Sequence, residues 1–279
     1  MKKSIPQWLI VFFTAMTIFS CKETVQETIE EVKTADTKIV YTPITNEGIE
    51  NAVIYEANIR QYSKAGTFNE FTKDIPELKK LGVKVIWLMP IFPISEKGRK
   101  AEKDLLVVDV KDPIKRSKSL GNYYAVADYE KINPDLGTEE DLEYLIKTAH
   151  DNGMYVILDW VANHTGLDNS WIKNYPEFYT KDTRGNIAHP KGTDWTDTAE
   201  LNYENKELWD LMASAMVYWV DRFNVDGYRC DRAGDVPTEF WNYASKSVRD
   251  VKPVLMLACL LYTSPSPRDQ RGSRMPSSA

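Results

Sequence analysis

Two short polar clusters in the sequence carry side chains that could do chemistry. Asp159, Asn163 and His164 stand in the first cluster, and Arg229 and Asp231 stand in the second. Arg229 and Asp231 are two residues apart, so on a strand their side chains would share one face. A fixed cation beside a carboxyl group keeps that group ionised and oriented. This is what a carboxylate nucleophile requires, so Asp231 is a candidate nucleophile with Arg229 as its partner.

Each cluster follows an apolar strand in a repeated pattern of helix and strand. The pattern predicts strands at 52–57, 83–88, 154–159, 225–229 and 254–258. Apolar residues at helical spacing predict helices at 69–80, between the cap Thr138 and the stop Gly153, and at 206–223. Helices that alternate with nearly continuous apolar strands indicate a parallel sheet covered by helices.

The strand spacing favours a (β/α)8 barrel over a doubly wound sheet. The first and last intervals between strand starts are about 30 residues, the size of a bare strand–helix–strand unit, and the middle two are roughly 40 residues longer. The extra segments, 95–135 and 163–205, both follow the carboxyl end of a strand, where a barrel carries its catalytic loops. No glycine-rich phosphate loop follows the first strand, which argues against the doubly wound alternative. A single Asp at a strand end is usually a helix cap, but two polar clusters at one barrel face favour a site.

The composition indicates which classes of protein fit this sequence. The chain has 279 residues, of which 43 % are hydrophobic and 27 % are charged, as in a globular protein with a sizeable core. Its net charge of −6 argues against a nucleic-acid binder, which normally shows a basic footprint. The 8 Trp and 15 Tyr suit a core or a cleft that stacks on sugar faces.

The first residues predict export. Lys2 and Lys3 precede an apolar run at 8–19, and the small Ser20 follows it. The run is shorter than the roughly 20 apolar residues that a spanning helix needs. Residues 1–20 therefore have the pattern of a secretion signal peptide.

The residues after the signal predict a lipid anchor and a tether. Residues 18–21 resemble a bacterial lipobox, in which Cys21 is lipidated and becomes the new N-terminus. Phe19 is bulkier than the usual residue there, so cleavage by an ordinary signal peptidase is the alternative. Residues 21–47 are polar and rich in Thr and Glu, which predicts a flexible linker. We expect an exported cell-envelope lipoprotein, periplasmic or outer-membrane, that meets a membrane only through its lipid.

From about Ala52 to Ala258 the sequence resembles the α-amylase family of retaining glycosidases, glycoside hydrolase family 13. Four segments carry the resemblance in the family's order: 122–142, 159–164, 198–202 and 227–233. The resemblance implies an α/β fold, a (β/α)8 TIM barrel with a small inserted domain after the third strand, at about 163–205. It also implies cleavage of α-glucosidic bonds in starch-like glucans by a retaining double displacement.

The resemblance also implies a role for each matching residue. Asp231 would form the covalent glycosyl intermediate, with Arg229 as its partner. His164 would hydrogen-bond hydroxyl groups of the sugar being cleaved, and Tyr124 would stack on its ring. An ordinary core tyrosine and a buried structural histidine are the alternatives for Tyr124 and His164.

Calcium is the one cofactor that the resemblance suggests. Asn163 matches a position that ligates a structural Ca²⁺ in many family members, and a carboxamide oxygen suits that hard ion. Glu200 is a second candidate ligand, although the family's usual Asp is absent there. The expected partner is an α-glucan or malto-oligosaccharide, with no nucleic acid.

The family's second catalytic carboxyl group has no counterpart here. Retaining glycosidases use two carboxyl groups about 5 Å apart, one as nucleophile and one as acid/base. In this family the acid is a Glu at the end of the fifth strand, where this chain has Cys259, and no Glu follows Glu239. Residues 259–279 are rich in Ser, Pro, Arg and Gly and predict a foreign or disordered tail.

We therefore expect residues 48–258 to be a barrel truncated after about the fifth strand. The enzyme class would be an α-amylase-type glycosidase, and the chain as written would lack activity because the acid is missing. Two alternatives stay open: a non-catalytic α-glucan-binding relative and an inert truncated product. An oriented Asp231 argues against the binder, which has no use for a nucleophile.

Overall fold

The computed structural model describes residues 44–102 and 105–259. The described residues belong to one compact unit, and the description below concerns this unit alone. The predicted signal peptide at 1–20, the predicted lipidation site Cys21, residues 21–43 of the predicted linker and residues 260–279 of the predicted tail lie outside the described residues. None of the helices in the described part of the chain is long and apolar enough to cross a bilayer.

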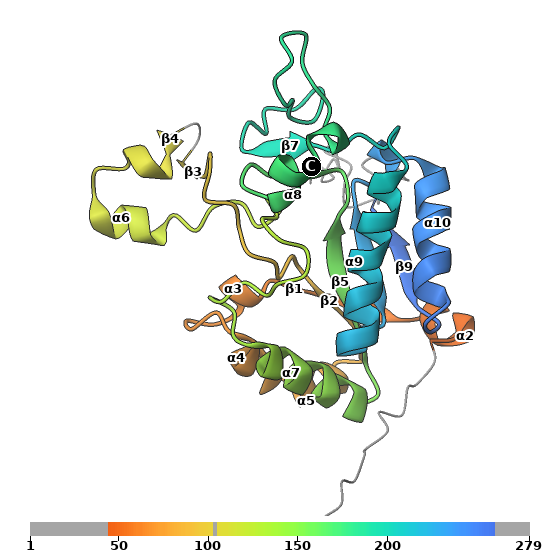
Figure 1. Ribbon diagram of the computed structural model, residues 1–279. Helices are drawn as coiled ribbons and strands as arrows, with labels where there is room; N and C mark the ends of the chain where they lie inside the picture. Colours follow the sequence, from red (N-terminus) through yellow and green to blue (C-terminus); the bar gives the residue numbers. More distant parts are fainter. Residues whose placement is uncertain (1–43, 103–104, 260–279) are drawn as a thin grey trace, which may run out of the picture. The chain divides into compact units, whose positions relative to one another are not determined.

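A five-stranded parallel sheet organises the unit (Figure 1). Its strands are β1 (Val53–Ala57), β2 (Val83–Leu88), β5 (Tyr155–Val161), β8 (Gly227–Asp231) and β9 (Leu255–Ala258). They lie side by side in chain order, β1-β2-β5-β8-β9, and each neighbouring pair is parallel. A doubly wound sheet would reverse its order at a switch point. The uninterrupted order confirms the predicted succession of parallel strands and excludes the doubly wound alternative for the described residues.

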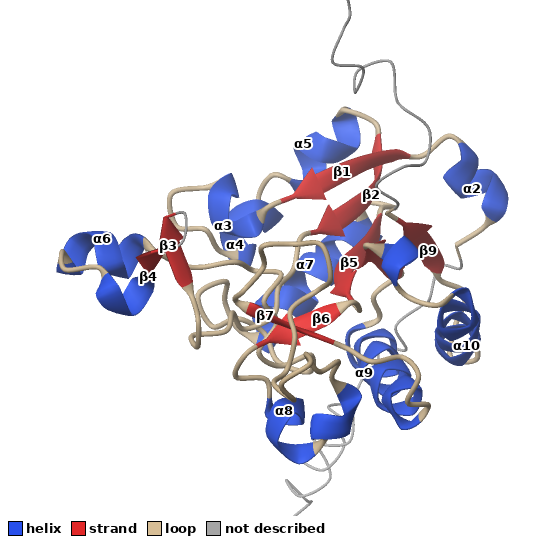
Figure 2. Ribbon diagram, turned by 90° about the horizontal axis from the view of Figure 1, so that it is seen from above, coloured by secondary structure: helices blue, strands red, loops and turns tan. Residues whose placement is uncertain are grey.

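Several helices lie on one side of this sheet. They are α4 (Phe68–Thr72), α5 (Ile75–Lys80), α7 (Glu139–Asp151), α9 (Glu207–Phe223) and α10 (Thr238–Arg249). Figure 2 shows α5, α7, α9 and α10 along the outside of the curved row of strands. The remaining helices of the described residues are α2 (Asn46–Glu50), α3 (Ile59–Tyr62), α6 (Pro113–Lys118), α8 (Ser170–Asn174), η1 (Val107–Asp109), η2 (Pro176–Phe178) and η3 (Ala233–Asp235).

Side chains of the sheet alternate between two apolar layers. Val156, Leu158 and Trp160 are fully buried in the large core that the helices cover. Val85 and Ile157 belong to a second, smaller cluster on the opposite face of the sheet. Successive strand residues point to opposite faces, so two buried faces produce the nearly continuous apolar runs of the sequence.

The helix predicted at 69–80 is two helices, α4 and α5, separated at Lys73 and Asp74. Pro76 lies in the first turn of α5 and has no backbone N–H to donate to the preceding turn. The predicted single helix was wrong for this reason, although its apolar face is buried as expected. The other two predicted helices are present, and a Thr138–Asp141 capping box begins α7.

The entry to β8 requires two special backbone positions. Asn224 ends α9 in the left-handed conformation, with φ of 57°. At Gly227 a Cβ atom would lie only 1.9 Å from the carbonyl oxygen of Leu255 on β9. Only glycine allows β9 to approach β8 this closely, so the position of Arg229 and Asp231 on β8 depends on it.

Two long segments follow the carboxyl ends of β2 and β5. The first contains β3 (Lys100–Glu102), β4 (Leu105–Leu106), η1 and α6. The second, within 163–205, contains β6 (His164–Gly166), α8, η2 and β7 (Thr198–Glu200). β6 and β7 pair as an antiparallel ribbon, and Figure 1 shows β7 beyond the end of β5.

Candidate active site

A cleft of about 420 Å³ lies at the carboxyl ends of β5 and β8. Its lining residues are Asn122, Tyr124, His164, Trp195, Arg229, Asp231, Arg232 and Cys259. The four catalytic and substrate-binding candidates from the sequence thus meet in one cleft, although they come from three segments far apart in the chain. Polar side chains at this end of parallel strands are placed as barrel enzymes place theirs.

Arg229 connects the carboxyl groups of the site. Its Nη1 donates to both carboxylate oxygens of Asp159, at 3.0 Å each, and to Oδ1 of Asp231 at 2.8 Å. Its Nη2 donates to the Sγ of Cys259 at 2.8 Å. One guanidinium therefore fixes the orientation of Asp231 and also reaches position 259.

Asp159 lies beneath this arrangement with its carboxyl group fully buried. Besides the Arg229 bonds, it accepts a hydrogen bond from Trp87 Nε1 at 3.0 Å and one from the Tyr124 hydroxyl at 3.2 Å. Burial raises the pKa of Asp159 to about 7, against the opposing effect of Arg229. Asp159 therefore forms the buried ion pair that holds Arg229 in place.

Asp231 is the acidic residue that faces the cleft. Its side chain is 14 % exposed, whereas that of Asp159 is 0 % exposed. Burial raises the pKa of Asp231, and Arg229 acts in the opposite direction as both ion-pair and hydrogen-bond partner. A carboxylate that is oriented through one oxygen and accessible from a cleft can attack an electrophilic carbon.

The backbone turns sharply directly after Asp231. Arg232 has φ of 46°, a left-handed conformation that is uncommon for a long side chain. Its guanidinium lies 4.7 Å from the ring centroid of Trp195 and pairs with Asp235. This turn brings a residue of the 163–205 segment against the end of β8.

His164 is the histidine that lines the cleft. The side chain is buried, and its Nδ1 lies 3.3 Å from Oδ1 of Asn163. Its Nε2 has no hydrogen-bond partner among the described residues. Burial, followed by the charge of Arg232, lowers the pKa of His164 to about 4, so the imidazole is neutral at pH 7. A neutral imidazole with an unsatisfied nitrogen is suited to hydrogen-bond a hydroxyl group of a ligand.

Tyr124 is half-buried, and its ring lies beside that of Tyr123, with the centroids 5.4 Å apart. Burial, followed by the charge of Asp159, raises the pKa of Tyr124 well above its usual value. Its hydroxyl is therefore a permanent donor to Asp159, while the ring lines the cleft. The sequence left open whether Tyr124 is a core tyrosine or a residue that contacts the sugar. In the structure Tyr124 packs partly in the core and also lines the cleft.

Sequence reasoning did not find Trp87, Trp195 and Arg232. The ring of Trp87 lies against Arg229, with the guanidinium 4.7 Å from its centroid. A tryptophan within the mainly apolar strand 83–88 was the available signal, because its N–H needs a buried acceptor. Trp195 and Arg232 are far apart in the sequence and come into contact only in the folded chain, so no local sequence pattern predicts their contact.

The calcium prediction at Asn163 is neither supported nor contradicted by the arrangement of side chains. The described residues contain no group of three or more His, Cys, Asp or Glu side chains that could hold a metal ion. Oδ1 of Asn163 contacts His164, and Oε1 of Glu200 accepts a hydrogen bond from Lys191 N at 3.2 Å. A calcium site needs six to eight oxygen ligands. The calcium site therefore stays a sequence prediction, and no step below depends on a metal.

Comparisons with known proteins agree with one another. The family description "Alpha amylase, catalytic domain" matches residues 23–268. Among solved structures, the chain is similar to an α-amylase from Lactobacillus plantarum (39 % identity, TM-score 0.66, 75 % of this chain and 45 % of that chain). It is also similar to a noncanonic maltogenic α-amylase from Thermotoga neapolitana (37 % identity, TM-score 0.65, 76 % and 46 %).

Curated relatives include a transferase as well as an α-amylase. The chain is 26 % identical over 219 residues to an α-1,4-glucan:maltose-1-phosphate maltosyltransferase from Salinibacter ruber, covering 76 % of this chain and 33 % of the relative. It is 26 % identical over 238 residues to α-amylase 3 from Dictyoglomus thermophilum, covering 74 % and 42 %. The chain thus spans between a third and a half of these relatives. With the family match over most of its length, the chain belongs to the α-amylase family and carries part of that family's catalytic domain.

Proposed function

We propose that the protein cleaves α-glucosidic bonds of starch-like glucans by a retaining double displacement, with Asp231 as the nucleophile. The observation that carries this proposal is the pair of hydrogen bonds from Arg229 to Asp231 and to the buried Asp159. These two hydrogen bonds orient the Asp231 carboxylate toward the cleft. Neutral hydrogen-bonding groups line the same cleft. The substrate class follows from the family and from a relative at 25 % identity, the α-amylase of Geobacillus thermoleovorans, whose structure holds acarbose.

In the first step a carboxylate oxygen of Asp231 attacks the anomeric carbon, and the bond to the leaving oxygen breaks. Arg229 holds the other carboxylate oxygen and prevents rotation of the group. His164 Nε2 accepts or donates a hydrogen bond at a hydroxyl of the reacting sugar, and Tyr124 contacts its ring. In the second step water, or a glucan hydroxyl in a transfer reaction, attacks the same carbon and releases Asp231.

The leaving oxygen must also receive a proton. Asp231 is the only carboxyl group among the described residues that line the cleft, and Cys259 stands where the family carries its acid. The two terminal nitrogens of the Arg229 guanidinium contact Asp231 and Cys259 respectively. A carboxyl group at position 259 would therefore be separated from Asp231 by about the width of this guanidinium. That separation suits the roughly 5 Å between the two carboxyl groups of retaining glycosidases. A proton donor at position 259 would therefore complete the site.

Export and anchoring belong to the same proposal. The protein would be secreted, lipidated at Cys21 and held at the cell envelope by residues 21–47, so that its glucan substrates lie outside the cytoplasm. These inferences rest on the sequence pattern at residues 1–21.

An activated substrate tests the proposed function on the chain as it exists. Fluoride leaves without protonation, so α-maltosyl fluoride needs the nucleophile but not the acid. The protein should release fluoride, and Asp231→Asn should lower that rate by about 10⁴-fold or more. Asp221→Asn, an exposed change on α9, is the matched control and should leave the rate unchanged. Malto-oligosaccharide binding without fluoride release would instead identify the non-catalytic glucan binder.

A further inference from the structure

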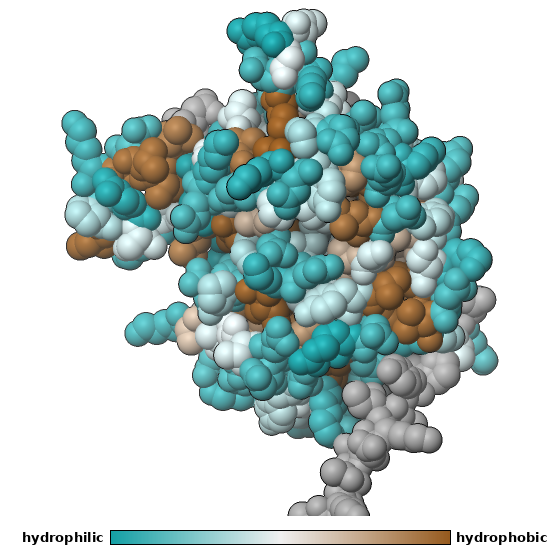
Figure 3. Space-filling model, in the orientation of Figure 1, coloured by the Kyte–Doolittle hydropathy of each residue, from teal (hydrophilic) through white to brown (hydrophobic). Residues whose placement is uncertain are grey.

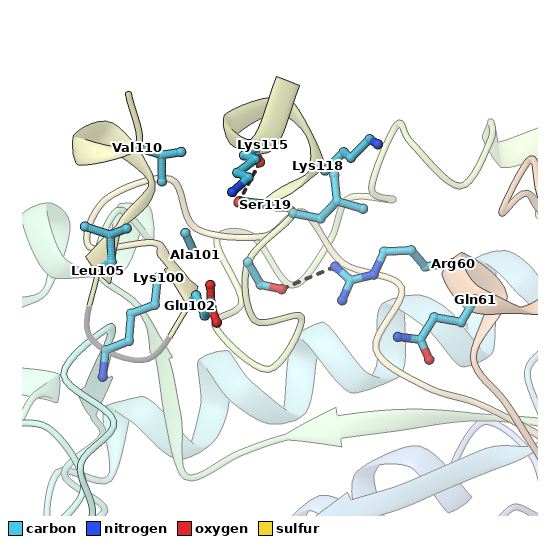
Figure 4. Close-up of a pocket in the computed structure, with 12 residues that line it drawn as sticks. Arg60, Gln61, Lys100, Ala101, Glu102, Leu105, Val110, Lys115, Lys118 and Ser119 are labelled. Atoms are coloured by element: carbon cyan, nitrogen blue, oxygen red, sulfur yellow. Dashed lines mark hydrogen bonds between the residues drawn. The ribbon is translucent and has the colours of Figure 1, made fainter. Parts of the chain in front are cut away.

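A second and larger hollow lies beside the active-site cleft. It has a volume of about 720 Å³ and is walled by α3, β3, β4, α6 and the residues that follow α6 (Figure 4). We call it the basic cavity, after its lining residues: Arg60, Gln61, Lys100, Ala101, Glu102, Leu105, Val110, Lys115, Lys118, Ser119, Leu120 and Gly121. Nothing in the proposed mechanism uses it.

The lining of the basic cavity is cationic although the chain is acidic. Four basic side chains and one carboxylate, that of Glu102, line the cavity, which gives 4 − 1 = +3, whereas the whole chain carries −6. Three of the cations, Arg60, Lys115 and Lys118, form no ion pair with a carboxylate among the described residues. They come from two elements, α3 and α6, that lie on different sides of the hollow in Figure 4. Like charges concentrated in a hollow attract a counter-ion.

Arg60 is the most constrained of these cations. Its guanidinium lies 4.4 Å from the ring centroid of Tyr123, and its Nη1 donates to the carbonyl oxygen of Gly121 at 3.3 Å. Burial lowers the pKa of Arg60, and the charge of the neighbouring Arg99 acts in the same direction. A partly desolvated guanidinium held in a fixed orientation is a good partner for a bidentate anion such as phosphate.

The basic cavity and the active-site cleft share one stretch of chain. Gly121 lines the cavity, while Asn122 and Tyr124 line the cleft. Tyr123 stands between them, with Arg60 against its ring and the Tyr124 ring 5.4 Å away, centroid to centroid. Its hydroxyl accepts a hydrogen bond from Asn58 Nδ2 at 3.2 Å, which fixes the ring. Because Gly121 and Asn122 are consecutive in the chain, the two hollows lie close to one another.

The size and the remaining lining favour a sugar derivative over an inorganic ion. The volume falls in the range of about 300–1,000 Å³ that small-molecule sites occupy. Leu105, Val110 and Leu120 add apolar surface, which suits the C–H faces of a sugar ring. Figure 3 shows apolar side chains together with polar ones over the β3–α6 segment.

We propose that the basic cavity binds an anionic substituent of the glucan, a phosphate ester, while neutral sugar units of the same chain lie in the cleft. The proposal rests on the proposed function and names a substrate class within it, phosphorylated α-glucans. The phosphate would pair with Arg60 and with the lysines of α6, which meet no carboxylate in the described part of the chain.

Matched ligands test this proposal. The probes are malto-oligosaccharides obtained by partial digestion of phosphate-bearing starch, and the same mixture after phosphatase treatment. At low salt, titration calorimetry on the full chain should give an affinity about tenfold higher for the phosphorylated mixture, because charged hydrogen bonds are gained. The advantage should shrink as salt is added.

Two double variants test whether the lysines of the basic cavity cause the preference for the phosphorylated mixture. Lys115→Gln with Lys118→Gln changes two exposed side chains of the cavity and should reduce the affinity ratio toward one while leaving the neutral ligand unaffected. Lys79→Gln with Lys173→Gln makes the same change in net charge at exposed lysines outside the cavity, and it should preserve the ratio.

Each remaining outcome contradicts the proposal in a different way. Equal affinity for the two mixtures, with measurable binding of the neutral one, overturns the phosphate site but leaves the proposed function intact. Binding of neither mixture overturns both. Tight binding of inorganic phosphate alone, unaffected by neutral oligosaccharide, reduces the cavity to a free-anion site. Binding to anionic lipid vesicles that the α6 variant abolishes, without preference among the sugars, would assign the cavity to a membrane surface instead.

Discussion

At the scale of single residues, the site works through one cation shared by two carboxyl groups. Arg229 donates to the buried Asp159 and to the accessible Asp231. Asp159 is held by Trp87 and Tyr124 as well, so it balances the charge of Arg229 without being available for chemistry. The accessible partner is then the group free to react. The division of roles follows from the difference in exposure of the two carboxyl groups.

His164 gives a prediction about stability and pH. Its pKa is lowered to about 4 in the folded protein, against about 6.5 in an unfolded chain. The unfolded state therefore binds more protons than the native state between these values, so acid favours unfolding. The stability that depends on neutral His164 should be complete above pH 6.5 and decrease by about 3 kcal/mol as pH falls to 4.

Urea titrations of the wild type and His164→Gln at several pH values check this. The wild-type free energy of unfolding should decrease relative to that of the variant as the pH falls through this window, and the difference should be flat above it. His189→Gln, a change at an exposed histidine, is the control and should show no such trend. A wild type and His164→Gln variant with parallel pH profiles would mean that His164 is not buried in a neutral form.

The sequence predicted the pairing of Arg229 with Asp231 because side chains two residues apart on a strand share a face. Trp87 and Trp195 were missed for a physical reason. Trp87 is 72 residues from its hydrogen-bond partner Asp159, and Trp195 meets Arg232 across two separate loops. Contacts of this kind are created by the strand order and the loop path, which no local pattern encodes.

At the scale of elements, the opposite end of the sheet carries its own buried ion pair. Asp226, just before β8, is 2 % exposed. Its Oδ1 accepts from Lys252 Nζ at 3.0 Å, and its Oδ2 accepts from Val156 N at 2.8 Å and contacts His150 Nε2 at 2.7 Å. This group joins α7, β5, β8 and the segment before β9, and it helps to set the register of the strands that carry the site.

Removing Asp226 should therefore be costly. Asp226→Ala leaves the buried ammonium of Lys252 without its carboxylate, and a broken buried ion pair costs about 3–5 kcal/mol. Chemical denaturation should show this loss, and Asp226→Ala with Lys252→Met should recover part of it because the uncompensated charge is gone. Asp250→Ala breaks the exposed Lys246–Asp250 pair and should cost at most about 1 kcal/mol. Equal losses from the buried and the exposed change would contradict the role assigned to Asp226.

The helices and strands could be predicted where a local pattern of apolar residues marks them. All five strands of the main sheet lie within about two residues of their predicted positions, because strands buried on both faces read as apolar runs. The split between α4 and α5 was missed because the apolar residues continue at helical spacing across Lys73 and Asp74. The two layers of the sheet and the contact of β8 with β9 at Gly227 depend on partners distant in sequence.

At the scale of the whole molecule, the strand order and the family agree. Five parallel strands in chain order, with helices outside them, are the arrangement expected for the first part of a barrel. The chain covers 45 % of the α-amylase from Lactobacillus plantarum and 46 % of that from Thermotoga neapolitana. The described residues contain the cleft with Asp231, so the proposed role of Asp231 can be tested on this chain.

The most direct test of the central claim is to identify the residue that becomes glycosylated. A fluorinated maltosyl fluoride, whose ring fluorine slows both steps and the second one more, should leave the glycosyl group attached to the protein. Mass spectrometry of an acid-protease digest should then show one maltosyl-type adduct, carried by Asp231 as an ester, and none in Asp231→Asn. An adduct on another residue, or fluoride release by the wild type with no adduct at all, would contradict a double displacement through Asp231.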